Sequence, residues 1–360
     1  MSDYFLCYST SMSFFKNHWR AISAVLIPIF AAAATVTTLT VIIPKYQTAT
    51  SNVGQTTMTS DDPVAVTPQT QSEATAPAAA TPAATQYGDK YANGLLPVGD
   101  GKYSTTTASK GSILLCQSPN TSGGPGGGAD TRGPWFTSNN TQYDINKKIA
   151  VSGNIKWDGN YTMKIVNGNR IITTNDVPSD HTTGVFPIKS SDAAYLYDHN
   201  PNTIKLQSLS FTFPAAPVAL SKPGCMSGGT IGVMTTGVAL FNGFDAEGRD
   251  AGAWEIQDSC GGHPQQSGEY HYHTLSSCIT DVSSTKVIGY AADGYPITGP
   301  TVSKGNIMTT TDLDECHGTT SSIMLDGTMT NAYHYVMTQD FPYSISCFKA
   351  ASKITKPGIQ

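Results

Sequence analysis

The sequence predicts a mainly β, disulfide-stabilised extracytoplasmic domain, sandwich-like or barrel-like, behind an N-terminal transmembrane anchor. Charged residues make up only 13% of the 360 residues, while 34 glycines and many serines and threonines favour strands and turns. Apolar residues form short alternating runs, and no segment carries a long, capped repeat of 3.6 residues. Six of the seven cysteines follow a single apolar segment, as expected for disulfides formed outside the cytoplasm.

The N-terminal region begins with a short polar tail and an uncharged apolar segment. Residues 1–20 are a predicted cytoplasmic tail, and residues 21–43 are long enough to cross a bilayer as a helix. Lys16 and Arg20 precede the apolar segment and are expected to keep the N-terminus in the cytoplasm. We therefore predict a single-pass membrane protein whose membrane partner is residues 21–43 and whose main domain lies outside.

A cleaved signal peptide is the alternative interpretation of the same segment. Residues 22–30 would then be its apolar core, and the alanines at 31–34 would provide the cleavage site. The apolar run continues to residue 43, which favours an anchor that is retained. Under either interpretation the rest of the chain lies outside the cytoplasm, membrane-anchored or secreted.

The composition then changes twice along the chain. Residues 44–89 are rich in Thr, Ala, Pro and Gln and predict a disordered stalk, because such a stretch cannot bury a core. Residues 90–352 are the predicted β-rich domain, and residues 353–360 are a short tail. Strands are expected from alternation and from flanking turn residues at 113–118, 148–157, 161–166 and 202–213, with a strand pair at 231–244.

The residues that could bind a metal or take part in catalysis lie in the second half of the domain. Residues 258–278 read DSCGGHPQQSGEYHYHTLSSC, and a looser copy at residues 313–347 begins LDECHG and passes through AYHYV. The two stretches suggest the disulfides Cys260–Cys278 and Cys316–Cys347, which leaves Cys116 to pair with Cys225.

A metal site is predicted from the run Tyr270-His271-Tyr272-His273. In a strand, residues two apart share a face, so the two imidazoles would stand about 6.7 Å apart at the backbone and could converge on one ion. Such a pair with one distant histidine can form a three-histidine zinc site. Candidates for the third ligand are His263, His317 and His334.

The acidic residues nearby have two possible roles. Asp258, Asp293 and Asp314 are predicted to orient the imidazoles by accepting hydrogen bonds from the ring nitrogens that do not face the metal. Imidazole ligands suit zinc or copper, whereas calcium and magnesium prefer more carboxylates. A metal with an open position would activate water or polarise a carbonyl or phosphoryl oxygen, so metal-dependent hydrolysis is the first functional hypothesis. Its candidate bases are Glu255, Glu269 and Asp293.

A structural role is the alternative for the same histidines. They would then fasten turns, and the protein would be a non-enzymatic cell-surface module. Such a module would bind glycan or protein through Trp135, Trp157 and Trp254. Whether the protein is an enzyme stays open, and no catalytic residue is assigned.

Several classes of function are disfavoured by what the sequence lacks. There is no basic block, so nucleic acid is not an expected partner. An even set of exported cysteines leaves no free thiol nucleophile, and neither a Gly-x-Ser-x-Gly elbow nor a His-Glu-x-x-His helix occurs. His181, in the loop 175–187, either caps the site or only makes a turn.

These motifs, in this order, resemble the YHYH protein family. The resemblance rests on PSDHTTGVFP, the Asn200-Pro201 pair, IGVMTTGVALFNGFDAEGRDA, the YHYH stretch itself, GYAADGYPITGP and LDECHG with its downstream YHYV and DFPYSISCF. It covers nearly all of residues 130–348 and implies an exported or surface domain, with no particular reaction. The second copy departs from the pattern because it ends in Val336 where the first has His273.

Overall fold

The computed structural model describes residues 90–119 and 131–352, and the structural statements below concern these residues. They form a mainly β structure with three disulfides, which confirms the predicted fold class at this level. The predicted cytoplasmic tail, anchor and stalk lie outside the described residues, as does the C-terminal tail. Within the described part of the chain, no helix has the length and apolar character needed to span a bilayer.

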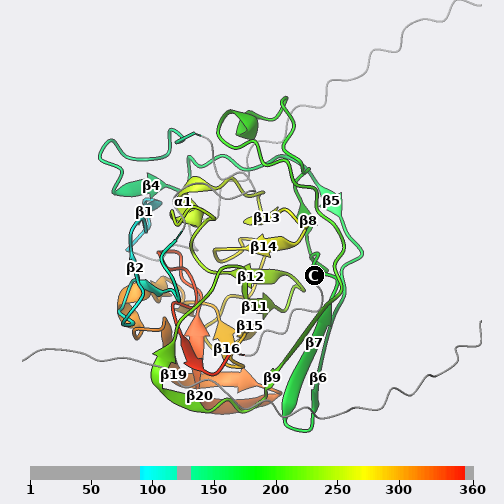
Figure 1. The fold of residues 1–360 in the computed structure, drawn as a ribbon, viewed down its shortest axis with the longest axis vertical. Coiled ribbons are helices and arrows are strands. Elements are labelled where there is room, and N and C mark those ends of the chain that lie inside the picture. The colour runs from blue at the N-terminus through cyan, green and yellow to red at the C-terminus, as the bar shows by residue number, and fades with distance from the viewer. Residues whose placement is uncertain (1–89, 120–130, 353–360) are drawn as a thin grey trace, which may run out of the picture. The chain divides into compact units, whose positions relative to one another are not determined.

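An open eight-stranded sheet organises the fold, in the order β13-β14-β12-β11-β15-β16-β20-β19 (Figure 1). Strands β13 and β19 form its edges. The two central strands, β11 and β15, are almost entirely buried and, apart from Thr230, contain no polar side chain except the Tyr290 hydroxyl, as expected where both faces of a sheet are covered. The strands are β11 (Thr230–Met234), β12 (Ala239–Phe241), β13 (Gly262–Pro264), β14 (Tyr270–Tyr272), β15 (Val287–Ala291), β16 (Pro296–Thr298), β19 (Gly318–Leu325) and β20 (Thr328–Val336).

The sheet consists of two halves with the same connections. In the first half, β11 and β12 form an antiparallel pair, and β14 of the pair β13–β14 lies parallel to β12. In the second half, β15 and β16 form the antiparallel pair, and β20 of the pair β19–β20 lies parallel to β16. The halves meet through β11 and β15, where Val233 is opposite Tyr290. The sheet therefore has a local two-fold arrangement.

The register identifies which residues correspond in the two halves. Gly262 lies opposite Tyr272 in the first half, and Gly318 lies opposite Tyr335 in the second. Tyr272 also pairs with Leu240 of β12, as Tyr335 pairs with Ile297 of β16. By this register the three first-half histidines His263, His271 and His273 correspond to Thr319, His334 and Val336.

In the described part of the chain, the large sheet is accompanied by six smaller sheets and three short helices. The three-stranded sheet β6 (Tyr161–Val166), β7 (Asn169–Thr174) and β9 (Leu209–Pro214) packs against the two central strands of the large sheet. Its Ile172, Phe211 and Phe213 form one apolar cluster with Val233 and Tyr290, which is a sandwich-like arrangement.

The other small sheets are two-stranded. They pair β1 (Leu95–Pro97) with β4 (Gln142–Asp144), β2 (Tyr103–Ser104) with β3 (Ile113–Leu114), β5 (Ile155–Lys156) with β8 (Thr182–Thr183), β10 (Ala219–Gly224) with β21 (Phe348–Ala350), and β17 (Thr301–Ser303) with β18 (Asn306–Ile307). The helices are α1 (Ala251–Trp254) and 3-10 turns at Ala193–Leu196 and Thr310–Asp312.

The predicted strand at 202–213 differs from the structure, because part of its backbone forms hydrogen bonds with loops. The segment 161–166 is β6, and the pair expected at 231–244 is β11 and β12. The segment 202–213 becomes a strand only at Leu209, because the N–H groups of Lys205 and Gln207 donate to the loop carbonyls of Gly268 and Asn175. Alternation alone does not reveal such loop partners.

The structure contains the three disulfides that the sequence suggests. Cys260–Cys278 joins the turn before β13 to the segment after β14, and Cys316–Cys347 does the same for the second half. Cys116–Cys225 joins segments 109 residues apart. Each crosslink stabilises the fold mainly by restricting the unfolded chain.

Folding stability is expected to fall at acid pH through buried histidines such as His317. Burial lowers the pKa of His317 from 6.5 to about 4. The unfolded state therefore binds a proton that the folded state does not between these values, and stability decreases as pH falls from 6.5 towards 4. The contribution of His317 is on the order of 3 kcal/mol.

The variant His317→Asn tests this contribution. Asparagine tolerates the positive φ of 70° at this position. Urea unfolding at pH 7 and pH 4.5 should show a smaller loss of stability in the variant than in the unmodified chain. Equal losses would mean that His317 is not a source of the acid sensitivity.

Candidate metal centre

Three histidines of the first half converge at the edge of the large sheet. His263 lies on β13 directly opposite His271 on β14, and His273 follows β14 two residues later. All three residues are buried. One nitrogen from each ring lies within 4.8 Å of the others, a spacing that could hold a metal ion. The tyrosines of the run point to the other face, where Tyr270 bonds Asp258 and Tyr272 bonds His181.

Backbone carbonyls determine the tautomer of two of these histidines. Nδ1 of His271 lies 3.2 Å from the carbonyl oxygen of Glu269, and Nδ1 of His273 contacts the carbonyl oxygen of Asn242. A carbonyl only accepts, so each Nδ1 carries the hydrogen and donates it. In the neutral rings both Nε2 atoms then carry lone pairs, yet they lie 3.0 Å apart. A cation between them would relieve this repulsion, and metal-bound histidines commonly use their second nitrogen in this way.

The second half provides an internal comparison for His271. The corresponding His334 contacts hydroxyl oxygens on both sides, with Nδ1 2.9 Å from Thr298 and Nε2 2.8 Å from Ser321. By the same register, Phe241 and Gln265 replace these two residues in the first half. Phe241 stacks on His271 with ring centroids 3.8 Å apart, and the Gln265 amide donates to Ser267 and Glu269. At these two positions the first half therefore has a phenyl ring and a carboxamide where the second half has hydroxyls.

Two further groups at the cluster lack hydrogen-bond partners. Neither ring nitrogen of His263 makes a hydrogen bond, and Oε2 of Glu255 makes none, although all three atoms are buried. This oxygen lies 3.4 Å from Nε2 of His263 and 3.2 Å from Nε2 of His273. Buried unpaired polar atoms cost about 1–3 kcal/mol each, so their presence together calls for a ligand.

Burial holds the imidazoles in the form that binds metal. It lowers the pKa of His263 well below its ordinary value, and His273 and Lys148 lower it further. Burial also lowers the pKa of His273 to about 4, against the opposing hydrogen bond to Asn242. Neutral imidazoles with available lone pairs are the metal-binding form, so no proton has to leave them at neutral pH.

The pKa of Glu255 moves in the opposite direction. Burial raises it well above the ordinary value, and the carboxylates of Asp245 and Asp198 add to this effect. Lys148 opposes the shift and also donates from its Nζ to the backbone carbonyl of Glu255 at 2.6 Å. A carboxyl group with a raised pKa beside a metal site is suited to accept and return a proton.

A cavity of about 460 Å³ opens onto the cluster. Glu255 and all three histidines line it, so the site is accessible to a small molecule although each residue is largely buried. Phe241 and Phe244 form part of its wall. A metal bound here would therefore have room for a water or substrate in an open position.

The other two predicted ligands lie in the second half, away from this cluster. His317 contacts the hydroxyl of Thr338 through Nε2 at 3.0 Å, and His334 contacts the two hydroxyls described above. Both residues are buried with protein partners. The spacing in the sequence does not distinguish these histidines from His263, because only strand pairing decides which one faces His271.

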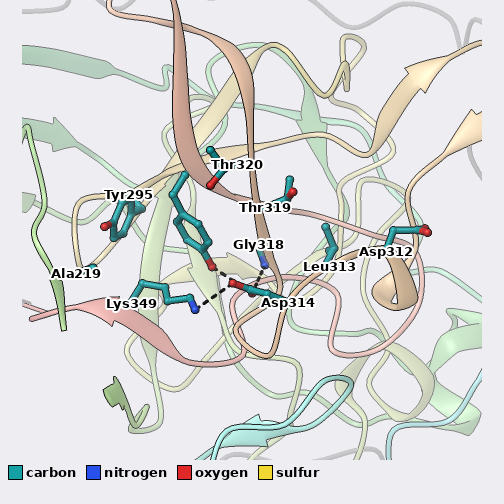
Figure 2. Close-up of a pocket in the computed structure, with 10 residues that line it drawn as sticks. Ala219, Tyr295, Asp312, Leu313, Asp314, Gly318, Thr319, Thr320 and Lys349 are labelled. Carbon is teal, nitrogen blue, oxygen red and sulfur yellow. Dashed lines mark hydrogen bonds and ion pairs between the residues drawn. The ribbon is translucent and has the colours of Figure 1, made fainter. Parts of the chain in front are cut away.

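The three predicted orienting aspartates bond tyrosines and backbone instead of imidazoles. Asp258 accepts from the Tyr270 hydroxyl at 2.8 Å, and Asp293 accepts from the Tyr335 hydroxyl at 2.7 Å. Asp314 lies in a second cavity, of about 570 Å³, where Lys349 pairs with it at 3.1 Å (Figure 2). Asp258 and Asp314 also accept from backbone N–H groups of Cys260 and Cys316 in the tight turns that precede β13 and β19. These turns place the carboxylates on the side of the sheet where the tyrosines lie. Backbone carbonyls orient the imidazoles in their place.

The suggested bases and the tryptophans also lie in different parts of the fold. Of the three suggested bases, Glu255 has a carboxylate oxygen beside His263 and His273. The Glu269 carboxylate accepts from Thr230, and Asp293 belongs to the second half. Trp135 is buried and donates to the carbonyl of Ala253, so it offers no binding surface. Trp157 and Trp254 are half-buried against the core. The roles of Phe241, Asn242 and Lys148 had no signal in the sequence.

Fold and site together define a disulfide-bonded β domain with a buried three-histidine group, and the three disulfides indicate an extracytoplasmic location. The family model described as YHYH protein matches residues 210–306, which confirms the resemblance over this segment. The match includes all of the first half, with its three histidines, and ends before β19 and β20 of the second. No curated protein and no solved structure gives a significant match to the chain.

The disulfide Cys260–Cys278 is expected to support the histidine cluster. Replacing both cysteines by serine should weaken metal binding, because the crosslink closes the segment that carries all three histidines. It should also lower stability by about 3 kcal/mol. The control is Cys116→Ser/Cys225→Ser, whose longer loop predicts a larger loss of about 5 kcal/mol. Zinc titration should nevertheless give an unchanged affinity for this control, and equal weakening in both variants would contradict the prediction.

Proposed function

We propose that His263, His271 and His273 bind one transition-metal ion, zinc or copper, and that the protein is a metal-dependent hydrolase. The observation that carries the proposal is the pair of imidazoles whose Nδ1 atoms donate to carbonyls and whose Nε2 lone pairs face each other at 3.0 Å. Nitrogen ligands of a tetrahedral zinc lie about 3.4 Å apart, so only small movements are required.

Zinc suits the hydrolytic part of the proposal best. A zinc ion held by three imidazoles supplies a Lewis acid that polarises a carbonyl and lowers the pKa of water. Three histidine ligands would leave room for one further ligand from the adjoining cavity. Copper suits the same ligands but adds redox chemistry that hydrolysis does not use.

Glu255 is the base in this proposal. Its Oε2 lies beside Nε2 of His263 and of His273, and it faces the same cavity. It would take a proton from the attacking water and return it to the leaving group. Lys148 holds the backbone of Glu255 from behind and keeps a positive charge near the carboxylate.

Elemental analysis of the full, disulfide-bonded chain tests the metal proposal. The expected result is about one equivalent of zinc or copper after dialysis against both ions, together with ester hydrolysis that a chelator removes and zinc restores. A chain that retains no metal would show that the histidines are structural. A chain that binds metal and hydrolyses no substrate would retain the metal site and overturn the assignment as a hydrolase.

A further inference from the structure

The cavity that opens onto the histidines, here called the substrate cavity, has an apolar side and a polar side. Leu115, Met226, Phe241 and Phe244 provide an apolar side. The polar side is made largely of carboxamides. Among the described residues, no lysine or arginine lines the substrate cavity.

The polar groups of the substrate cavity are mostly engaged with the protein. The side-chain amides of Asn200 and Asn202 both donate to the carbonyl of Pro264. Asp245 is paired with the guanidinium of Arg249 at 2.7 Å. Glu255 is the other carboxylate among the lining residues, and its Oε2 has no hydrogen-bond partner.

This distribution of charge selects against anionic substrates. Proteins commonly bind phosphate, sulfate and carboxylate groups through arginine or lysine, and the cavity offers neither. Apart from the proposed metal ion, the described lining residues offer an anionic group no cationic partner, and Glu255 and the apolar wall oppose its entry. An uncharged ligand with an apolar part has only a small desolvation cost when it enters the cavity.

Phe241 places the apolar wall next to the reacting position. Its ring stacks on His271 and meets His273 edge-on, with centroids 5.9 Å apart. An apolar acyl chain lying on this ring would bring its carbonyl towards the three imidazole nitrogens. The remaining wall at Leu115 and Phe244 can cover the rest of such a chain.

We infer that the substrates are uncharged carboxylic esters or amides with an apolar acyl group, and not phosphate or sulfate esters. The inference rests on the proposed hydrolytic function. In the reaction the oxygen of water bonds to the acyl carbon, and the bond from that carbon to the leaving oxygen or nitrogen breaks. Glu255 carries one water proton to the leaving group, which yields a carboxylic acid and an alcohol or amine. No oxidant or reductant takes part.

Paired chromogenic substrates test the inference on the zinc-loaded full chain. The kcat/KM for p-nitrophenyl butyrate should exceed that for p-nitrophenyl phosphate and p-nitrophenyl sulfate by about 100-fold after correction for their spontaneous rates. A preference for the phosphate or sulfate would overturn the inference while the hydrolase proposal stands. A chain without metal would overturn both.

A binding measurement tests the ligand preference of the substrate cavity independently of the turnover rate. Cobalt-substituted protein reports ligands through its visible spectrum, so butyrohydroxamic acid and inorganic phosphate can be compared directly. The hydroxamic acid should bind at least about 10-fold more tightly than acetohydroxamic acid or phosphate. Tighter binding of phosphate would reject the uncharged, apolar substrate class.

A charge placed at the mouth of the cavity provides a second test. Gln117 is exposed and lines the substrate cavity, so Gln117→Arg should shift the butyrate-to-phosphate preference by about 10-fold towards phosphate. The matched control is Thr328→Arg on the exposed hairpin of the second half, where the preference should not change. An unchanged preference in Gln117→Arg would show that charge in the cavity does not select the substrate.

Discussion

Replacing His271 with alanine is expected to remove zinc binding, whereas replacing His334 with alanine leaves it intact. The two histidines hold the same register position in the two halves of the sheet. His271 directs Nε2 towards His273, while both nitrogens of His334 contact hydroxyls. Loss of one of three ligands should weaken zinc binding by about 1000-fold.

Thermal unfolding with and without zinc measures this difference. Zinc at about 100 times its dissociation constant stabilises a protein by about 2.7 kcal/mol. The unmodified chain and His334→Ala should both gain this stability, and His271→Ala should gain almost none. His334→Ala should start from a lower Tm because it leaves the buried Thr298 hydroxyl and the half-buried Ser321 hydroxyl without this partner. Equal gains in both variants would place the zinc elsewhere.

Replacing Glu255 with glutamine is expected to reduce kcat by about 1000-fold while zinc remains bound. Glutamine keeps the size of the side chain and removes its ability to take a proton. The backbone contact from Lys148 to the Glu255 carbonyl does not depend on the side chain, so the local fold should persist. Zinc content and hydrolysis are measured on the same sample.

The control for this variant is Glu315→Gln. Glu315 pairs with Lys349 at 2.7 Å in the second half, away from the three-histidine group, and its replacement should leave kcat unchanged. If Glu255→Gln loses zinc together with activity, Glu255 is a ligand and not the base. If it keeps both, the base is another group.

The local residue pattern was sufficient to predict those features that depend on a single strand. Alternation within residues 270–273 places His271 and His273 on one face and the two tyrosines on the other, because successive side chains in a strand point in opposite directions. The disulfide pairs also followed from two stretches of similar sequence, and the structure contains them. The mainly β class followed from composition and short apolar runs.

Long-range strand pairing decided the rest of the candidate site. The sequence by itself determined a disulfide-bonded β domain, a His-x-His pair and a repeat that lacks the last histidine. Only the tertiary structure decided that His263 is the third member, because β13 places it opposite His271. It likewise decided that Glu255 faces the cluster and that carbonyls, not Asp258, orient the rings. These contacts join residues from different strands and loops, and no local spacing in the chain encodes which of them meet.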